Sequence, residues 1–265
     1  MEDYSKFLEV ALKAAKAGSE VALSYYNKVI AVDKKTHLGE FNPVTEADLE
    51  TEKVISEIIR KEFPLHCIIG EECGSNNLVN EYSWYVDPID GTSNYARGIP
   101  NWGVMIGLCH NDVPVIGVIY LPITGEVFHA IKGKGAFKNF DKLRVSKVTT
   151  LSEAFIESPG QLRGENRQRI INFFEVFIPV VRNYRHFGAG AVMYPLLASG
   201  KVDLEVSEHC NLHDIVPGVI LAREAGGVAL NFKGEEWTAN TNNGIIIAST
   251  RELALEALQR LKHIK

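Results

Sequence analysis

The stretch Asp87-Pro88-Ile89-Asp90-Gly91-Thr92 places two carboxylates three residues apart, followed directly by a glycine and a hydroxyl. The preceding Trp84-Tyr85-Val86 is short and apolar, which is typical of a buried strand. Pro88 fixes its own φ and restricts the residue before it to extended geometry, while Gly91 permits a turn that other residues resist. We therefore predict a rigid elbow at a strand end, with both carboxylates and the Ile89 carbonyl facing one point.

Oxygen ligands of this kind suit a hard divalent cation, and Mg²⁺ in particular takes octahedral oxygen coordination. Thr92 adds a hydroxyl within reach of a metal-bound water. Asp-Pro and Asp-Gly are also ordinary turn dipeptides, and for a single dipeptide the turn would be the preferred interpretation. The complete run combines features that a turn does not need, so it predicts half of a metal-dependent hydrolase site.

A second acidic strand end lies upstream, where Glu71 and Glu72 follow a short apolar run. Open α/β sheets bind ligands at such strand ends. An exposed Glu-Glu pair on its own would be read as ordinary surface charge. Its place shortly before Asp87 favours Glu71 as a further metal ligand.

Two more aspartates have a structural and a functional interpretation, and the sequence leaves both open. Asp214 precedes an apolar helical stretch, and Pro217 fits within a first helical turn, so Asp214 is expected at or near a helix N-cap. A cap can also bind a metal through its second oxygen. Asp48 begins another helical run, and its spacing from Thr45 matches a capping box, with a peripheral metal role as the alternative.

Together these residues resemble the inositol monophosphatase family, which belongs to a wider group of lithium-sensitive, magnesium-dependent phosphatases. Three motifs carry the resemblance, in the order usual for the family: Gly70-Glu71-Glu72, the run from Trp84 to Tyr95, and His213-Asp214 ahead of Glu224-Ala225-Gly226-Gly227. The stretch from Pro43 to Asp48 is similar to the N-terminal metal loop of the family. The resemblance extends from about residue 4 to about residue 260.

The resemblance implies a Mg²⁺-dependent phosphomonoesterase with the layered αβαβα sandwich of sugar phosphatases and mixed sheets. It assigns two metal ions to Glu71, Asp87, Asp90, Asp214 and the Ile89 carbonyl, and a third, weaker ion to Asp48. It implies that Thr92 and Glu71 position and deprotonate the attacking water beside Asp90. The substrate phosphate and its leaving group would be bound at Ile89, Asp90, Gly91, Thr92, Ser93, Gly190 and Asp214.

Three positions depart from the family pattern. His213 stands where the family usually has Trp, and Pro217 stands where it has a small residue. Inositol-preferring members bind substrate hydroxyls with a Glu at the place of Ser207, although Glu205 is close by. Inositol monophosphate is the leading substrate by resemblance. Histidinol phosphate, fructose 1,6-bisphosphate and nucleotide 3′,5′-bisphosphates are the alternatives, and a non-catalytic binding protein is the rival of another class.

Composition limits the partners. The chain has 265 residues, is 46% hydrophobic and carries a net charge of −5, so it can bury a substantial core and has no basic excess for nucleic acid. No apolar stretch has the length of a membrane span, and the N-terminus shows no signal-peptide pattern. The four cysteines have no framework spacing, which favours reduced thiols in the cytoplasm. The resemblance adds an expected homodimer.

Hydrophobic periodicity predicts the order of the elements. Helices are expected at 4–26, 46–63, 165–177 and 190–199, around Asp214 and from Glu252; strands are expected at 67–69, 84–86, 103–109, 113–121, 126–131, 154–157, 182–187, 202–206, 228–232 and 245–249. The strands from 103 to 131 read as an antiparallel meander. We expect one compact unit with an α+β half at 1–145, carrying most metal ligands, and an α/β half at 146–265, carrying Asp214 and substrate-lining residues.

Overall fold

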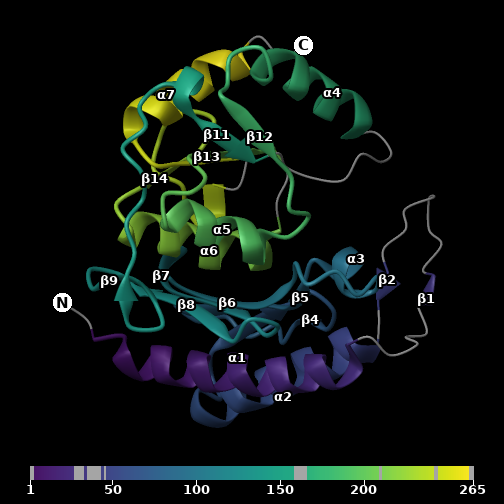
Figure 1. The fold of residues 1–265 in the computed structure, drawn as a ribbon. Helices are drawn as coiled ribbons and strands as arrows, with labels where there is room; N and C mark the ends of the chain where they lie inside the picture. Colours follow the sequence, from purple (N-terminus) through teal and green to yellow (C-terminus); the bar gives the residue numbers. More distant parts are fainter. Residues whose placement is uncertain are drawn as a thin grey trace.

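In a computed structural model, the chain forms five stacked layers in which helices and sheets alternate (Figure 1). The structure describes residues 3–26, 33–34, 43–44, 46–157, 166–208, 211–241 and 244–262. From one face to the other, the helical layers are the pairs α1 (Ser5–Tyr25) with α2 (Glu46–Glu62), α5 (Gly190–Ala198) with α6 (Leu212–Glu224), and α4 (Asn166–Phe177) with α7 (Arg251–Leu261). The αβαβα sandwich predicted from the sequence is confirmed.

The outer helices α1 and α2 form because their apolar residues recur at helical spacing. In α1 the buried side chains include Val10, Ala14 and Ala15, which share one face of the helix. A Cβ at Gly18 of α1 would overlap the side chain of Ile55 on α2, so glycine allows the two helices to approach closely. The predicted bounds of both helices agree with the structure to within one residue.

The larger sheet has eight strands in the order β10-β9-β8-β7-β6-β5-β3-β4. These strands are β3 (Cys67–Gly70), β4 (Gly74–Ser75), β5 (Tyr82–Asp90), β6 (Gly103–His110), β7 (Val113–Leu121), β8 (Glu126–Ile131), β9 (Gly135–Lys138) and β10 (Asp141–Lys142). Neighbours pair antiparallel except β3 with β5. The predicted meander is therefore confirmed as β6, β7 and β8. A separate antiparallel pair joins β1 (Asp33–Lys34) and β2 (Pro43–Val44).

The predicted elbow is wrong in one respect, because strand β5 does not end at Val86 but continues through the motif to Asp90. Asp87 pairs with Met105 and Asp90 pairs with Gly103, so the pairing with β6 shifts between these two aspartates. Two β5 residues lie between them against one on β6, as in a β-bulge. Because residues three apart on a regular strand face opposite sides, this extra residue is what turns both aspartates toward the same side. Pro88 fits here, since a bulge leaves one residue out of the ladder.

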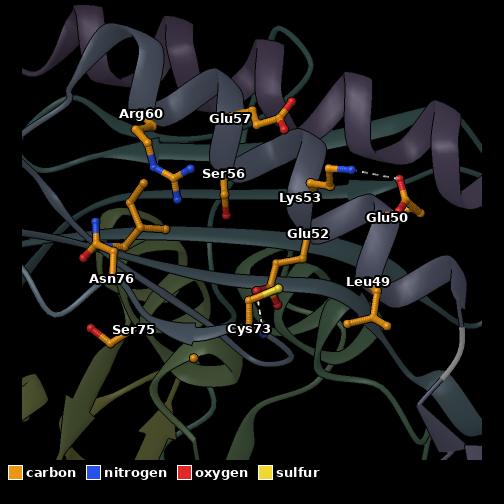
Figure 2. A pocket seen from close by; sticks show the side chains of 12 residues that line it. Leu49, Glu50, Glu52, Lys53, Ser56, Glu57, Arg60, Cys73, Ser75 and Asn76 are labelled. Carbon is orange, nitrogen blue, oxygen red and sulfur yellow. Dashed lines mark hydrogen bonds and ion pairs between the residues drawn. The ribbon is translucent and has the colours of Figure 1, made fainter.

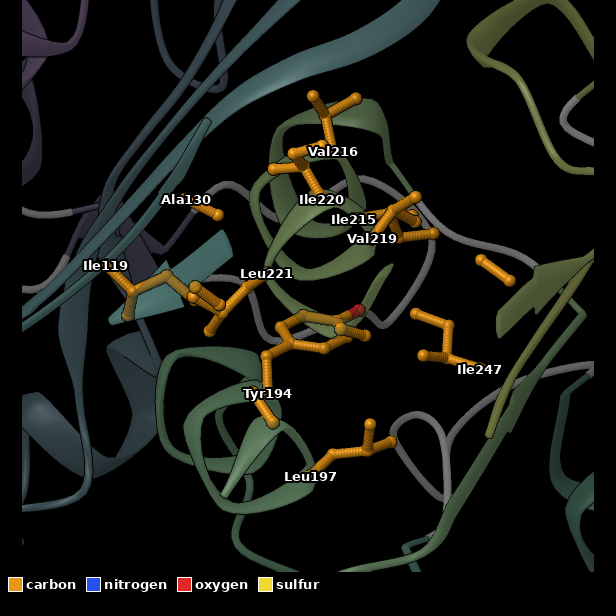
Figure 3. Packing of buried hydrophobic residues seen from close by; sticks show 14 of the residues in the cluster. Ile119, Ala130, Tyr194, Leu197, Ile215, Val216, Val219, Ile220, Leu221 and Ile247 are labelled. Atoms are coloured by element: carbon orange, nitrogen blue, oxygen red, sulfur yellow. The ribbon is translucent and has the colours of Figure 1, made fainter. Parts of the chain in front are cut away.

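A row of small residues crosses the centre of this sheet and receives helix α6. Gly107 on β6 pairs with Gly117 on β7, and Gly117 pairs with Ala130 on β8. A Cβ at Gly107 would overlap Val216 of α6, and one at Gly117 would meet the Pro217 carbonyl and Ile220. Around this contact the apolar side chains of α6 pack closely with the ring of Tyr194 from α5 (Figure 3). The helix is therefore seated directly on the backbone of the sheet.

The start of α6 differs from the prediction at Pro217 but not at Asp214. The N-cap is Asn211, and the helix begins at Leu212, so Asp214 lies in the first turn, near the cap as expected. Pro217 consequently lies inside the helix, beyond its first turn. The neighbouring Gly218 is in contact with the ring of Tyr194, where a Cβ would overlap the ring atoms. A negative charge in a first turn interacts favourably with the helix dipole, which suits Asp214.

The smaller sheet has five strands in the order β12-β11-β13-β15-β14. These strands are β11 (Phe155–Glu157), β12 (Asn183–Arg185), β13 (Leu204–Ser207), β14 (Val228–Leu230) and β15 (Ile245–Ala248). It is mixed, because β11 pairs parallel with β12 and β13 while β15 pairs antiparallel with β13 and β14. Short helical turns η1 (Leu151–Glu153), η2 (Ala239–Thr241) and α3 (Thr92–Tyr95) complete the described elements. The division at residue 145 stays a prediction.

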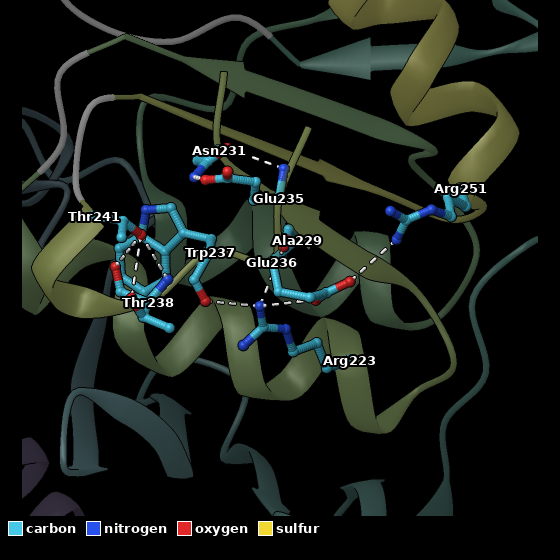
Figure 4. Close-up of polar contacts among 9 residues, drawn as sticks. All are labelled: Arg223, Ala229, Asn231, Glu235, Glu236, Trp237, Thr238, Thr241 and Arg251. Atoms are coloured by element: carbon cyan, nitrogen blue, oxygen red, sulfur yellow. Dashed lines mark hydrogen bonds and ion pairs between the residues drawn. The ribbon is translucent and has the colours of Figure 1, made fainter. Parts of the chain in front are cut away.

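A polar network fixes the C-terminal end of α6 against the smaller sheet (Figure 4). The Nη2 atom of Arg223 donates to the carbonyl oxygens of Ala229 and Trp237, at 3.1 and 2.8 Å, and lies 3.2 Å from Glu236 Oε2. Arg251 of α7 forms an ion pair with the other oxygen of Glu236, at 3.1 Å. The network therefore links α6, β14 and α7, which holds α6 between the two sheets.

None of the helices in the described part of the chain combines the length and the apolar character that crossing a bilayer requires.

Candidate active site

Asp87 and Asp90 are fixed by hydrogen bonds that leave part of each carboxylate available. Asp87 Oδ1 accepts the amide of Ile89 at 3.0 Å within the bulge. Asp90 Oδ2 accepts the amide of Ala191 at 2.6 Å, across the interface with α5. Asp90 therefore stabilises the first turn of α5 with a negative charge, where backbone amides lack helical partners. This bond ties the first sheet to the middle layer of helices.

Asp214 joins these two aspartates from the first turn of α6. One carboxylate oxygen of each of Asp87, Asp90 and Asp214 lies within 4.8 Å of the other two. His213 Nε2 lies 3.2 Å from Asp214 Oδ1, so the histidine packs beside the cluster. The seating of α6 on the glycine row of the sheet is what brings Asp214 to this place.

Glu71 is the fourth carboxylate, and it lies in the turn between β3 and β4. Its amide donates to the Val86 carbonyl of β5 at 3.1 Å, because β3 runs parallel beside β5. Its carboxyl group hydrogen-bonds to that of Asp87. Four of the five acidic residues predicted as metal ligands, all except Asp48, are therefore brought together by the turn, the bulge and the helix α6.

The charges of this cluster act against one another. Burial together with the negative charges of Asp214 and Glu72 raises the pKa of Glu71 to about 8. Burial and the charge of Asp214 raise the pKa of Asp90 to about 7, and burial with the charge of Glu71 raises the pKa of Asp87. Burial also raises the pKa of Asp214, although His213 opposes this shift. A partly buried all-oxygen donor set that resists its own ionisation fits a hard divalent cation.

The loop after β5 places the predicted phosphate-binding residues next to the carboxylates. Gly91 has a φ of +87° and is the N-cap of α3. A Cβ there would also overlap Ala189 and the Asn101 carbonyl, so glycine is required for conformation and for space. Thr92 Oγ1 donates to the Ile89 carbonyl at 3.1 Å. The backbone amides of Asn94 and Tyr95 donate to the Gly91 carbonyl oxygen. The amides of Thr92 and Ser93 therefore come before the first hydrogen bonds of this helical turn.

Asn94 is a residue of the central motif whose role the sequence analysis missed. Its Nδ2 donates to the Asn101 carbonyl at 2.8 Å and to the Phe187 carbonyl at 3.0 Å. Phe187 belongs to the segment that leads into α5, where Gly190 lies in contact with Tyr194 and near Asp90. The Asn94 side-chain amide therefore positions Gly190 near the carboxylate cluster. The place of Asn94 in the Thr92–Tyr95 run could have suggested this role.

Two further buried glutamates were not predicted as site residues. Glu157 at the end of β11 lies opposite Glu205 in the parallel pairing of β11 with β13. Each residue is only 6% exposed. Glu157 Oε1 lies 3.6 Å from His186 Nδ1, and Glu205 Oε1 accepts from the Tyr194 hydroxyl at 3.5 Å. The charge of Glu157 contributes, after burial, to the raised pKa of Asp90, so this pair lies near the carboxylate cluster. Glu205 Oε2 is buried and finds no hydrogen-bond partner among the described residues.

The remaining predicted residues lie around this centre. Asp48 is buried in the first turn of α2, outside the three-aspartate group and close enough to raise the pKa of Tyr95 by its charge. Its metal role stays a prediction, and Thr45 of the proposed capping box lies outside the described residues. Ser207 ends β13 two positions after Glu205, so both side chains face the same side of the strand. Cys67, Cys73 and Cys109 are free thiols, and Cys210 lies outside the described residues.

Comparison with family models gives one clear result. Residues 3–264 match the model described as the inositol monophosphatase family. A protein of Aquifex aeolicus (strain VF5) named fructose-1,6-bisphosphatase/inositol-1-monophosphatase is 35% identical over 232 residues, covering 86% of each chain. An inositol-1-monophosphatase of Bacillus subtilis (strain 168) is 30% identical over 250 residues, covering 93% of each chain.

Solved structures of the same kind superpose on nearly the whole chain. An inositol monophosphatase from Anabaena (Nostoc) sp. PCC 7120 is 30% identical with a TM-score of 0.85, covering 100% of this chain and 98% of that one. An IMPase of Thermotoga maritima is 28% identical with a TM-score of 0.86, covering 98% of each chain. Both likenesses include both sheets and all three helical layers.

Proposed function

The chain belongs to the inositol monophosphatase family and is a phosphatase that hydrolyses phosphomonoesters; from this premise we propose that its preferred substrate is an inositol monophosphate. The observation that carries the proposal is the convergence of Glu71, Asp87, Asp90 and Asp214 beside the Thr92 turn. Relatives named inositol-1-monophosphatase support the same substrate class. The relatives named fructose-1,6-bisphosphatase/inositol-1-monophosphatase make a sugar bisphosphate the second candidate.

The family is metal-dependent, and the donor set fits Mg²⁺. Our proposal is that Glu71, Asp87, Asp90, Asp214 and the Ile89 carbonyl hold two Mg²⁺ ions and that Asp48 supports a third. When bound, two such ions supply a nucleophilic water at neutral pH and positive charge for the attacking and leaving oxygens. Phosphate monoesters hydrolyse extremely slowly unaided, so this stabilisation of charge is the main requirement of the reaction.

The protein's own groups then orient the reactants. Thr92 Oγ1 donates its proton to the Ile89 carbonyl, so its lone pairs face outward and can accept a hydrogen bond from the attacking water. Glu71, whose carboxyl group interacts with those of Asp87 and Asp90, is the proposed acceptor for the proton that the water loses. The amides of Gly91, Thr92 and Ser93 donate to the phosphate oxygens at the start of α3. Gly190 lines the substrate site next to Asp90, where a side chain would overlap the ring of Tyr194.

The paired glutamates give a reason to prefer a polyol monophosphate over a bisphosphate. Glu157 and Glu205 form a buried acidic wall near Asp90, and Glu205 Oε2 has an unused acceptor position among the described residues. Burial raises the pKa of both carboxyl groups, so they resist ionisation. A hydroxyl group can form a hydrogen bond with such a carboxyl group, whereas a second phosphate disfavours its ionisation further. Glu205 thus supplies the acidic group that Ser207 lacks.

Phosphate release from a panel of esters tests the proposal. With Mg²⁺, we expect the highest kcat/KM for inositol 1-phosphate, lower values for histidinol phosphate, fructose 1,6-bisphosphate and adenosine 3′,5′-bisphosphate, and no turnover after chelation. A bisphosphate as the best substrate would contradict the inositol assignment. If folded, Mg²⁺-binding protein released no phosphate from any of these esters, the result would favour a non-catalytic binding protein instead.

The place of Glu205 beside Glu157 predicts how Glu205→Gln changes the KM for the two candidate substrates. Replacement of the carboxyl group should raise the KM for inositol 1-phosphate by about two- to tenfold, since a hydrogen bond between neutral groups contributes roughly 0.5–1.5 kcal/mol. The same change should leave the KM for fructose 1,6-bisphosphate unchanged or lower it, because an amide cannot ionise beside the second phosphate. Steady-state kinetics on both substrates check this, with the exposed Glu153→Gln as the control. Equal changes for the two substrates would show that the wall does not select the leaving group.

Two broader properties belong to the same proposal. We infer a homodimer, which is the common state of the family that the sequence resembles, and a location in the cytoplasm, where free thiols such as Cys67 and Cys109 stay reduced. Light scattering coupled to gel filtration would test the first of these.

A further inference from the structure

The turn that carries Glu71 is held by a side chain from a different element. Glu52 on α2 accepts the amide of Glu72 at its Oε2 atom, at 2.8 Å, and the amide of Cys73 at its Oε1 atom, at 2.9 Å. These are the two amides that directly follow Glu71. Figure 2 shows Glu52 reaching from α2 toward Cys73 in this turn. Both oxygens of one carboxylate are therefore used to bind the backbone of the turn.

Glu52 is well placed to act as a rigid anchor. It is 1% exposed and belongs to a 17-residue helix that packs along α1. Hydrogen bonds from two amides to one ionised carboxylate are charge-assisted, so they are stronger than bonds between neutral groups. The turn is also tied to β5 through the amide of Glu71 and the Val86 carbonyl. The backbone on both sides of Glu71 is thus fixed, from β5 on one side and from α2 on the other.

Gly70 provides the space that this anchor occupies. A Cβ at Gly70 would overlap all three atoms of the Glu52 carboxylate group. The φ of Gly70 is not in the left-handed region, so glycine is required here for the close approach and not for backbone conformation. The Gly70-Glu71-Glu72 motif therefore contains a glycine that admits the carboxylate, followed by the ligand that this carboxylate positions.

We propose that Glu52 is a positioning residue that sets the metal affinity of the active site by fixing the backbone around Glu71. This proposal rests on the proposed function of Glu71 as a metal ligand. Glu52 does not itself bind the metal, because its two oxygens are engaged by Glu72 and Cys73. Outer groups that hold ligands in place typically change metal affinity or activity by about 10- to 100-fold when they are replaced.

Glu52→Gln is the direct test. The amide has the same size but only one acceptor oxygen, so its NH₂ group would oppose one of the two backbone amides. We expect the dissociation constant for Mg²⁺, measured by isothermal titration calorimetry, to rise by about 10- to 100-fold. The Mg²⁺ concentration for half-maximal phosphate release should rise in parallel, while the KM for inositol 1-phosphate at saturating Mg²⁺ stays within about twofold of wild type.

Glu57→Gln is the matched control. Glu57 lies on the same helix and lines the same surface pocket of about 390 Å³ as Glu52 (Figure 2). Its side chain is exposed, and the amides of the turn bond to Glu52 instead. Replacement of Glu57 removes the same charge and should leave the Mg²⁺ affinity unchanged. Wild-type Mg²⁺ affinity in Glu52→Gln would overturn the proposal, even if that variant unfolds at a lower temperature in EDTA, because a purely structural role would give that result.

A double-mutant cycle with Gly70 distinguishes positioning from general destabilisation. Gly70→Ala should weaken Mg²⁺ binding in the wild-type background, because its Cβ displaces the Glu52 carboxylate. In a Glu52→Ala background the same change should cost little, since the overlap is gone. Additive losses would contradict the proposal. These measurements read metal binding directly, so a wild-type protein that binds Mg²⁺ without turning over the ester panel would overturn the proposed function and leave this test intact.

Discussion

Replacing Asp90 with asparagine is expected to reduce kcat/KM for inositol 1-phosphate by about a thousandfold or more. Asp90 is the residue that contacts both the carboxylate cluster and the first turn of α5. Removal of one preorganised group that stabilises charge in a transition state typically costs about 10²–10³ in rate, and here a metal ligand is lost as well. Phosphate release at saturating Mg²⁺ measures the effect.

The fold should survive this substitution. The Oδ1 atom of the new asparagine can still accept the Ala191 amide, which Asp90 binds at 2.6 Å. The metal-free variant should unfold at a temperature no lower than wild type, because one member of a mutually repelling cluster becomes neutral. Asp141→Asn, an exposed change on the edge strand β10, is the control and should keep full activity. Near-normal phosphate release by Asp90→Asn would refute the site assignment.

The second large effect concerns stability without metal. In EDTA we expect the midpoint of thermal unfolding to fall as the pH rises from about 4 to about 8. The pKa of Glu71 is raised to about 8 and that of Asp90 to about 7, from ordinary values of 4.5 and 3.8. Between the ordinary and the raised values, the folded protein binds more protons than the unfolded chain, so unfolding becomes easier as pH increases. This contribution is complete below about pH 4 and is lost above about pH 8.

Magnesium should remove this pH dependence. Mg²⁺ binds the ionised carboxylates, so its affinity increases with pH, and selective binding to the folded state raises the unfolding temperature. We therefore expect a larger Mg²⁺-induced shift at pH 8 than at pH 6, measured by differential scanning calorimetry at matched ionic strength. Asp90→Asn should lose stability less steeply with pH, because one titrating group is absent. A metal-free protein that is more stable at pH 8 than at pH 6 would show that the four carboxylates do not repel one another in the folded state.

Local sequence patterns predicted most elements of the fold because each has its own periodicity. The stretches that became β7 and β8 are apolar runs bounded by turn residues such as Asp112 and Gly125, and both of their predicted bounds are correct. Pro217 was expected within the first helical turn, but the helix begins at Leu212, so Pro217 lies beyond that turn. Proline inside this helix is tolerated where α6 lies against Gly117 of the sheet, a contact that the local sequence does not show.

The candidate site was predicted as a set of residues rather than as a geometry. Carboxylates next to strand ends, a proline and a glycine indicate oxygen-rich metal chemistry from residue type and spacing alone. The arrangement depends on a bulge that turns Asp87 and Asp90 to one side and on a row of glycines that seats α6. The pairing of Glu157 with Glu205 depends on the parallel contact of β11 and β13, which joins residues far apart in sequence.

The sequence by itself determined which chemical groups are present and which local elements carry them, because periodicity, turn residues and acidic motifs act over a few residues. Only the tertiary structure decided which of these groups meet. Strand register, the seating of α6 and the reach of Glu52 across to the Glu71 turn are set by the packing of distant segments. Packing of this kind depends on shape and close approach between elements, which no short stretch of sequence contains.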